Sequence, residues 1–594
     1  MINAISVNRK LFTMTLMALV LTAGLAFAQN TPAAAAPPAI TNYSAVTDAR
    51  LLNPEPENWL MYKGNYSLWG YSPLDQINTD NVTELVPVWT YSTGQTASHE
   101  APPIVNNGIM FATGAYNTLF VFNAATGDLL WSYARDLPQD VYPELCCDVN
   151  NRGVALYGNN VYMATLDAHL LAFDATTGKI LWDTTVADYT KGYTMTLAPL
   201  IVKGKVVVGV AGGEYGIRGF IQAFDSESGK ALWQTYTTAL PGETGGDTWP
   251  ANTAINGGGS IWVTGSYDPD TNITYWGTGN PGPFMGQVRP GDNLYTSSVL
   301  ALDMDTGKMV AHYQYNPNDS WDYDEVSDQT LIDVTRDGKE MKGLIHAGRN
   351  GYFYLLDRGN DLDFVYGEMY AKSTLTYTGF DDNGRPIVPA DRYPGINKQI
   401  YTCPSFQGGN NWEGISYDPN TGYAYVPTSE LCMNETGVQV VYQAGQKYVG
   451  VSAQNKAPEG MDMVGALQAI DVTTGKAVWR VDQKLPLRSP TMTTKGGLVF
   501  VGDVSTRQFR AFDAKTGDEL WHFTTNSGIV GVPVSFEVDG VQYIAVESGV
   551  GGNASRDVTN MAKALGVPYT PAPGGVVWVF ALKNQTSTGT TAQQ

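Results

Sequence analysis

Two adjacent cysteines, Cys146 and Cys147, are the residues whose spacing offers the most distinctive chemistry in this chain. A disulfide between sequence neighbours closes a small ring that includes the peptide bond, and this ring strains the backbone because ordinary disulfides hold their Cα atoms farther apart. Strain of this kind persists where the surrounding structure enforces it, often at a functional site. Two buried thiols that are adjacent by chance are the alternative, and the pair alone leaves both interpretations open.

The other two cysteines are Cys403 and Cys432, so two bridges can use all 4 cysteines. The sequence does not fix the connectivity, but a bridge within the first pair leaves Cys403 and Cys432 for a structural disulfide. No Cys-x-x-Cys-His motif occurs, so we expect no covalently attached c-type haem on this chain. The 5 histidines have no metal-ligand spacing, and P-loop, Rossmann and Gly-x-Ser-x-Gly motifs are absent.

The N-terminal segment predicts export. Arg9 and Lys10 precede an apolar run that extends from Leu11 to Leu25, and the small-x-small pattern ending at Ala28 matches a cleavage site. We therefore expect a signal peptide over residues 1–28, with a membrane anchor as the alternative, and no later membrane insertion. Disulfides persist in the compartment that such a peptide implies. The formal charge of -21 disfavours nucleic acid and anionic membranes as partners, and charge of this size more often maintains solubility.

A repeated pattern organises the chain. An apolar residue, Asp or Asn, then Gly and finally Trp recur with constant spacing at 122–131, 173–182, 224–233, 470–479 and 512–521, with degenerate copies at 302–311 and 417–422. Asp begins a tight turn, Gly takes a left-handed conformation, and the flanking alternation of apolar residues predicts a β-hairpin. The terminal Trp is large enough to dock one sheet on the next.

Repeats of roughly 40 to 50 residues made of short strands are typical of a β-propeller. We therefore expect an all-β fold with a single propeller domain over residues 29–582, and a solenoid of sheets is the alternative. The strand predicted at 576–580 is expected to pair with N-terminal sequence and close the ring. The Ser/Thr/Gln-rich segment 583–594 is predicted to be a disordered tail.

The repeat, the Cys146-Cys147 pair and several further segments resemble the periplasmic quinoprotein alcohol dehydrogenases of the methanol/ethanol dehydrogenase family. The resemblance covers essentially the whole mature chain. It implies an eight-bladed propeller that carries non-covalent pyrroloquinoline quinone (PQQ) and a metal ion. It further implies that the disulfide Cys146–Cys147 and the indole of Trp262 enclose the quinone. The other implied quinone-binding residues are Glu100, Arg152, Thr196, Ala211, Gly212, Gly213, Ser260, Arg349 and Asn411. Ala211 stands where some relatives have Ser, so only a backbone contact carries over there.

The metal ligands implied by the resemblance are Glu214, Asn280, Asp322 and Asp324. Carboxylate and amide oxygens suit a hard cation. Asp324 matches the lanthanide-type subgroup, since calcium-using relatives lack this acid, and a solvated Asp324 with calcium is the alternative. Glu325 follows where lanthanide methanol dehydrogenases usually have Gly, which argues against methanol as the substrate.

The implied reaction is the oxidation of a primary alcohol to an aldehyde in the periplasm. By resemblance Asp322 is the general base, and the cation polarises the quinone. Because no haem is expected on this chain, the electrons must pass to a separate partner, a soluble cytochrome c. A calcium-dependent alcohol or polyol dehydrogenase is the alternative enzyme, and a propeller scaffold is the non-enzymatic one. The sequence leaves the identity of the alcohol and a homodimeric state open.

Overall fold

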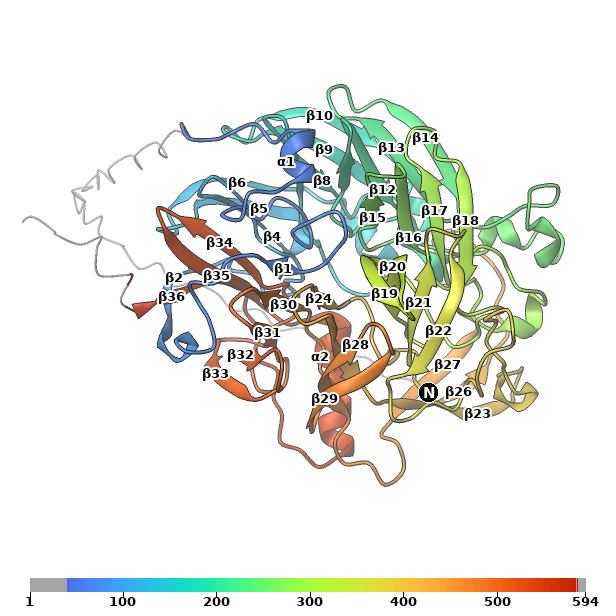
Figure 1. The fold of residues 1–594 in the computed structure, drawn as a ribbon. Helices are drawn as coiled ribbons and strands as arrows, with labels where there is room; N and C mark the ends of the chain where they lie inside the picture. The colour runs from blue at the N-terminus through green and yellow to red at the C-terminus, as the bar shows by residue number, and fades with distance from the viewer. Residues whose placement is uncertain (1–39, 584, 586–594) are drawn as a thin grey trace, which may run out of the picture. The chain divides into compact units, whose positions relative to one another are not determined.

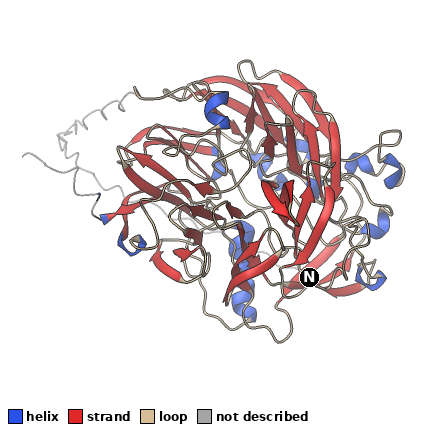
Figure 2. Ribbon diagram, in the orientation of Figure 1, coloured by secondary structure: helices blue, strands red, loops and turns tan. Residues whose placement is uncertain are grey.

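A computed structural model describes residues 40–583 and 585 of the chain. The predicted signal peptide over 1–28 and nearly all of the predicted tail lie outside these residues. The predicted all-β fold is confirmed, because strands dominate the ribbon (Figure 2) and the described α-helices are α1 (Asp48–Leu52) and α2 (Gly552–Ala564). No helix within the described part of the chain is long and apolar enough to cross a membrane.

The first half of the chain folds into sheets of four sequence-consecutive antiparallel strands (Figure 1). Their strands are β3 (Ile104–Asn106), β4 (Ile109–Gly114), β5 (Thr118–Asn123) and β6 (Leu129–Ala134); β7 (Ala155–Tyr157), β8 (Asn160–Ala164), β9 (His169–Asp174) and β10 (Ile180–Thr185); β11 (Leu200–Val202), β12 (Lys205–Gly209), β13 (Phe220–Asp225) and β14 (Ala231–Tyr236); β15 (Ser266–Asp268), β16 (Ile273–Gly277), β17 (Ser298–Asp303) and β18 (Met309–Gln314); and β19 (Thr330–Arg336), β20 (Lys339–Ala347), β21 (Tyr352–Asp357) and β22 (Asp363–Met369).

The second half repeats this plan with longer insertions. Its strands are β24 (Ser416–Asp418), β25 (Tyr423–Ser429), β28 (Gly465–Asp471) and β29 (Lys476–Gln483); β30 (Thr491–Thr494), β31 (Leu498–Gly502), β32 (Gln508–Asp513) and β33 (Glu519–Thr524), joined by β1 (Tyr71–Ser72); β34 (Val534–Val538), β35 (Val541–Ser548) and β36 (Val576–Leu582), joined by β2 (Leu85–Ser92); and a separate sheet of β23 (Gln399–Thr402), β26 (Cys432–Gly437) and β27 (Val451–Lys456). The predicted pairing of the last strand is confirmed, because β36 pairs with β2 and aligns Val579 with Trp89.

The turn between β9 and β10 shows why the repeat has its sequence. Asp174 Oδ1 accepts hydrogen bonds from the backbone N–H groups of Thr176 and Thr177 at 3.1 and 2.8 Å. Gly178 has a φ of 71°, and a Cβ there would lie 2.7 Å from the indole of Trp131. The Trp131 indole N–H also donates to Ala175 O at 3.1 Å. One repeat therefore docks on the turn of the next, and glycine is required there for both conformation and space.

The same indole contact joins successive sheets along the chain. It runs from Trp89 to Ala124 O, from Trp182 to Ser226 O, from Trp233 to Met304 O, from Trp479 to Ala514 O and from Trp521 to Leu85 O. The degenerate repeat 302–311 ends at Ala311 instead. A cavity of about 120 Å³ lies there, lined by Ala311, Arg358 and Leu362 among others, so this junction lacks the side chain that fills the others.

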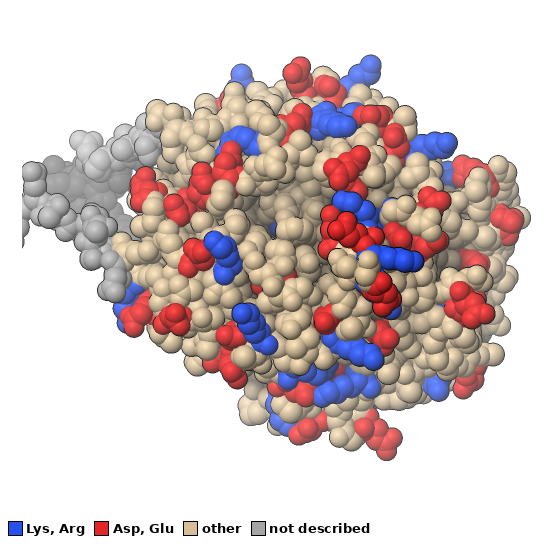
Figure 3. Space-filling view, in the orientation of Figure 1, with Lys and Arg blue, Asp and Glu red and all other residues tan. Residues whose placement is uncertain are grey.

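Side-chain charge is dispersed on the face of the molecule shown in Figure 3, where acidic and basic residues are interspersed among uncharged ones. Many carboxylates of this acidic chain are paired, as in the contact of Arg385 with Asp292 at 2.5 Å. Pairs at exposed positions contribute little to stability. The apolar strands and the docked tryptophans therefore supply the framework that positions the site.

Candidate functional site

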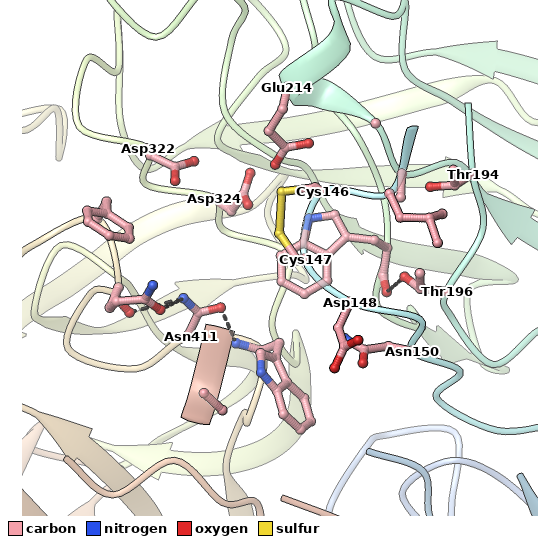
Figure 4. A pocket seen from close by; sticks show the side chains of 18 of the residues that line it. Cys146, Cys147, Asp148, Asn150, Thr194, Thr196, Glu214, Asp322, Asp324 and Asn411 are labelled. Carbon is pink, nitrogen blue, oxygen red and sulfur yellow. Dashed lines mark hydrogen bonds between the residues drawn. A yellow bond between two sulfur atoms is a disulfide. The ribbon is translucent and has the colours of Figure 1, made fainter. Parts of the chain in front are cut away.

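A cavity of about 280 Å³ gathers most of the residues singled out from the sequence (Figure 4). Of these, the cavity is lined by Glu100, Cys146, Cys147, Arg152, Thr196, Ala211, Gly212, Glu214, Trp262, Asp322, Asp324, Arg349 and Asn411. Gly213, Ser260 and Asn280 lie directly behind this lining: a Cβ on Gly213 would be 3.2 Å from Ser260 Oγ and 3.7 Å from Asn280 Oδ1.

The topology of the sheets explains this gathering. Most lining residues precede the first strand of a sheet, such as Arg152 before β7 and Trp262 before β15. Others follow the second strand, such as Glu214 in the short 3-10 helix η5 (Gly213–Tyr215) after β12 and Arg349 after β20. In an antiparallel sheet the beginning of one strand lies beside the end of the next. Loops of both kinds therefore emerge at the same end of each sheet.

Both predicted disulfides are present. Cys146 and Cys147 are bonded with their Cα atoms 3.7 Å apart, and Cys403 is bonded to Cys432. The sulfurs of the first pair lie within 4.8 Å of a Glu214 carboxylate oxygen. These bonded sulfurs are not thiolates and do not form a metal site with Glu214. In Figure 4 the disulfide lies in the middle of the cavity, with Glu214, Asp322 and Asp324 on one side and Thr196, Asp148 and Asn150 on the other.

One part of the cavity wall places the buried cation Arg152 beside two aromatic rings. Arg152 lies 2.7 Å from Glu100 in an ion pair, and its Nη1 donates to Thr196 Oγ1 at 2.8 Å. The Arg152 guanidinium lies 4.8 Å from the centre of the Trp262 ring and 5.1 Å from that of Trp412. Flat rings beside a fixed cation favour a planar, anionic ligand.

Arg349 organises the acidic side of the cavity. Its Nη2 contacts Asp324 Oδ2 and Asn411 Oδ1, both at 3.0 Å, and its Nη1 donates to Asp322 O at 2.7 Å. Asp324 Oδ1 accepts from the backbone N–H of Asn280 at 2.6 Å. Asp322 has a φ of 64°, an unusual conformation for a residue other than glycine and one that often marks a functional position.

Two buried oxygens at this side have no hydrogen-bond donor among the described residues, Asn280 Oδ1 and Asp322 Oδ1. The backbone at Gly279 also approaches Asp324 closely, since a Cβ on Gly279 would lie 2.6 Å from Asp324 Oδ1. Unpaired oxygens together with nearby carboxylates fit a hard, oxygen-seeking cation. The donor set is therefore suited to the predicted metal.

Burial raises the pKa values of the three carboxyls. It raises the pKa of Glu214 to about 7, with Asp324 as the next cause, and it raises the pKa of Asp322 well above the usual range of an aspartate. The pKa of Asp324 is raised as well, again chiefly by burial and against the opposing effect of Arg349. A cation at this position would favour the ionised carboxylates and reverse these shifts.

Glu325, which departs from the family pattern, points away from the cavity. It is fully buried, its carboxylate lies 2.7 Å from His346 Nε2, and it accepts from the backbone N–H of Arg349 at 3.1 Å. Its role in this structure is to fix the segment behind Asp324 and Arg349. It does not line the cavity and so does not itself determine the size of the substrate.

Sequence reasoning missed a further group of lining residues. They are Leu145, Asp148, Asn150, Leu166, Thr194, Phe284, Phe406, Gln407, Trp412, Lys447, Val449, Arg488, Ala554 and Arg556. Several of them immediately neighbour predicted residues, as Trp412 follows Asn411, and adjacency was a usable signal. Phe284 and Lys447 lie in long connections and Arg488 in a short one, and none of these connections carries the repeat, so the sequence offered no signal for them.

Comparisons with known proteins identify the family of the chain. The family model described as glucose/ethanol/alcohol dehydrogenase, beta-propeller domain, matches residues 59–363 and 382–544. The quinoprotein alcohol dehydrogenase PedH of Pseudomonas putida is 41% identical over 87% of this chain and 89% of its own length. The lanthanide-dependent methanol dehydrogenase of Methylacidiphilum fumariolicum is 37% identical over 90% of this chain and 94% of its own length. The solved structure of a europium-containing methanol dehydrogenase superimposes with a TM-score of 0.85 at 36% identity, covering 89% of this chain and 99% of that one.

Proposed function

Because this chain belongs to the PQQ-dependent quinoprotein alcohol dehydrogenases and is thus an oxidoreductase, we propose that it oxidises primary alcohols to aldehydes with PQQ and a lanthanide ion. The observation that carries the proposal is the single cavity in which the disulfide Cys146–Cys147, Trp262 and the acids Glu214, Asp322 and Asp324 meet. Membership of this enzyme family argues against the alternative that the chain is a non-catalytic propeller scaffold.

The quinone would be held between the Cys146–Cys147 disulfide and the Trp262 ring. Arg152 offers a fixed positive charge at this place, supported by Glu100 and Thr196. A charge-assisted contact with a carboxylate is stronger than a neutral hydrogen bond. When bound, the quinone and its cation supply the redox chemistry and the polarisation of the reacting carbonyl.

Asp322 is the base that we propose for the alcohol proton. Its Oδ1 is buried and has no hydrogen-bond donor within the described part of the chain, and Arg349 holds its backbone conformation through the hydrogen bond to Asp322 O. A base held in this way is pre-positioned to accept a proton from a substrate hydroxyl. Arg349 would stabilise negative charge that develops beside it, since its Nε has no acceptor among the described residues.

The charges around the cavity support a trivalent cation. Five acidic and five basic residues line it, the acids Glu100, Asp148, Glu214, Asp322 and Asp324 and the bases Arg152, Arg349, Lys447, Arg488 and Arg556. Three of these acids, Glu214, Asp322 and Asp324, lie at the place proposed for the cation, and a trivalent ion gains more than a divalent one from each added anionic oxygen. Two of the relatives described above also carry a lanthanide in their names. Calcium is the alternative cation, because the oxygen donors suit it too.

The remaining parts of the proposal concern assembly and location. We propose that the seven four-stranded sheets and the five-stranded sheet are the eight blades of a propeller. The protein would act in the periplasm after removal of the signal peptide and would pass electrons to a soluble cytochrome c. A homodimer is compatible with this function.

Reconstitution tests the function directly. Protein prepared without cofactors is incubated with PQQ and either a light lanthanide or calcium, and dye-linked oxidation of primary alcohols is followed without NAD. We expect activity that requires PQQ and is highest with the lanthanide. Higher activity with calcium would support the alternative metal, and absence of activity and of quinone binding with both metals would contradict the proposed function.

A further inference from the structure

Arg488 is a buried cation of the cavity wall that neither the repeat nor the family pattern singled out. It lies in the connection between β29 and β30, and its side chain is only 4% exposed. It nevertheless lines the same cavity as Arg152 and Trp262. An arginine in this environment remains charged, because guanidinium is not deprotonated in proteins.

The protein holds this guanidinium by one edge. Its Nε donates to Glu413 in a short hydrogen bond, and its Nη1 donates to Gln407 Oε1 at 2.6 Å. Nη1 also lies 3.6 Å from Asp557 Oδ2 on α2. Glu413 in turn accepts from the backbone N–H of Asn411 at 3.0 Å, so Arg488 is tied to the segment that carries a predicted quinone-binding residue.

The other edge of Arg488, formed by Nη2, has no hydrogen-bond partner in the part of the chain that the structure describes. Nη2 donates no hydrogen bond to a residue in the described ranges 40–583 and 585, whereas the other two buried arginines of the cavity use theirs. Arg152 Nη2 contacts Glu100 and Arg349 Nη2 contacts Asp324. Because Arg488 lines the cavity, this unpaired edge is available to an acceptor that a ligand supplies there.

We infer that Arg488 binds a carboxylate of the quinone through Nη2, as a cofactor-binding residue in addition to Arg152. The inference rests on the proposed function, because it takes PQQ as the ligand. A carboxylate is the acceptor that matches a guanidinium edge best. Glu413 and Gln407 are positioning residues, since each accepts a hydrogen bond from Arg488 and so orients its guanidinium. Asp557 connects this contact to α2.

Binding measurements test the inference without relying on turnover. Quinone-free protein is titrated with PQQ and with its trimethyl ester, which lacks the carboxylate charges, and tryptophan fluorescence reports binding. The variants are Arg488→Gln and Arg488→Lys. Arg480→Gln is the matched control, because Arg480 also pairs with two acids, Glu430 and Asp482, both at 2.7 Å, but does not line the cavity.

We expect Arg488→Gln to weaken PQQ binding about 10- to 100-fold, the loss of one charge-assisted contact, and to leave binding of the ester close to that of the wild type. Arg488→Lys should restore part of the affinity, and Arg480→Gln should change nothing. Equal PQQ affinity of Arg488→Gln and the wild type would overturn this inference but would leave the proposed function intact. No PQQ binding by the wild-type protein would overturn the proposed function as well.

A purely structural effect of Arg488 is separated by a second variant. Asp557→Asn removes the charge that ties Arg488 to α2 but keeps the guanidinium and its free edge. We expect this variant to bind PQQ nearly as well as the wild type. An equal loss of affinity in Asp557→Asn and Arg488→Gln would show that displacement of α2 is the cause and would overturn the inference. If Arg488→Gln fails to fold, Arg488→Lys decides the question: it should bind PQQ more weakly than the wild type and bind the ester equally well, and PQQ affinity equal to that of the wild type would overturn the inference.

Discussion

Asp324 is held by Arg349 through an ion pair in which Arg349 Nη2 lies 3.0 Å from Asp324 Oδ2. The same carboxylate accepts from the backbone of Asn280, so both of its oxygens are fixed beside the proposed cation. Arg349 therefore links Asp324, a proposed metal ligand, to Asp322, whose carbonyl it also binds. This contact makes Asp324 part of the site and argues against a solvated bystander, since its side chain is only 4% exposed.

The first prediction concerns the choice of cation. Asp324→Ala should lower lanthanide affinity roughly 10- to 100-fold or more and abolish lanthanide-supported activity, because a trivalent ion loses an anionic ligand. Activity with calcium should persist or appear. Asp322→Ala should remove activity with both metals, since the base is lost. Metal titrations with activity assays measure these effects, and Asp324→Asn is the control of equal size. An unchanged lanthanide response in Asp324→Ala would favour calcium as the natural cation.

The second prediction concerns the vicinal disulfide. Cys147→Ser should lower kcat/KM on the order of a hundredfold, because the cover over the quinone is displaced, while the sheets stay folded. Loss of the other bridge by a Cys403→Ser/Cys432→Ser double change should instead cost about 3 kcal/mol of stability. Thermal unfolding and steady-state kinetics separate the two effects. Equal melting temperatures and equal activity of Cys147→Ser and the wild type would show that the vicinal bond is dispensable.

The third prediction concerns stability and pH in the protein without metal or quinone. Burial raises the pKa of Glu214 from 4.5 to about 7, and of Glu100 likewise to about 7. The folded state therefore binds more protons than the unfolded state between these values, and the free energy of unfolding falls as pH rises through this window. Melting temperatures should be lower at about pH 8 than at about pH 5.

Glu214→Gln serves as the control for this pH dependence, because an amide does not ionise. We expect it to flatten the decrease in melting temperature. Addition of a lanthanide at high pH should raise the melting temperature of the wild type, as ligand binding to the folded state stabilises it, and should affect Glu214→Gln less. A melting temperature that rises steadily with pH in the metal-free wild type would contradict the assignment.

The fourth prediction concerns the junction without a docking tryptophan. Ala311→Trp should fill the cavity of about 120 Å³ beside Arg358 and Leu362 and raise the free energy of unfolding by about 1 kcal/mol. Removal of the equivalent ring at the preceding junction, Trp233→Ala, should cost about 3 to 5 kcal/mol. Denaturant unfolding measures both. A destabilised Ala311→Trp protein would mean that Arg358 and its partners cannot accommodate the ring.

The repeating hairpins and the all-β class follow from the sequence alone, and sequence reasoning also singled out many of the residues that line the cavity. The pattern at 173–182 specifies its own turn, because Asp174 and Gly178 act on neighbouring backbone, and local interactions of this kind are readable from sequence spacing. The cysteine pair and the acids at positions 322 and 324 were identified by family resemblance, which carried over to motifs that match it.

Which residues outside those motifs share the cavity depends on how the sheets are arranged in the folded chain. Arg488, Trp412 and Lys447 reach it from loops of different sheets, and their distance in the chain carries no information about their separation in space. The burial that leaves Arg488 with one free edge and turns Glu325 toward His346 likewise depends on neighbours brought together by folding. Each hairpin is specified by residues that are close together in the sequence. The cavity, in contrast, forms because the antiparallel sheets place loops from distant parts of the chain at the same end.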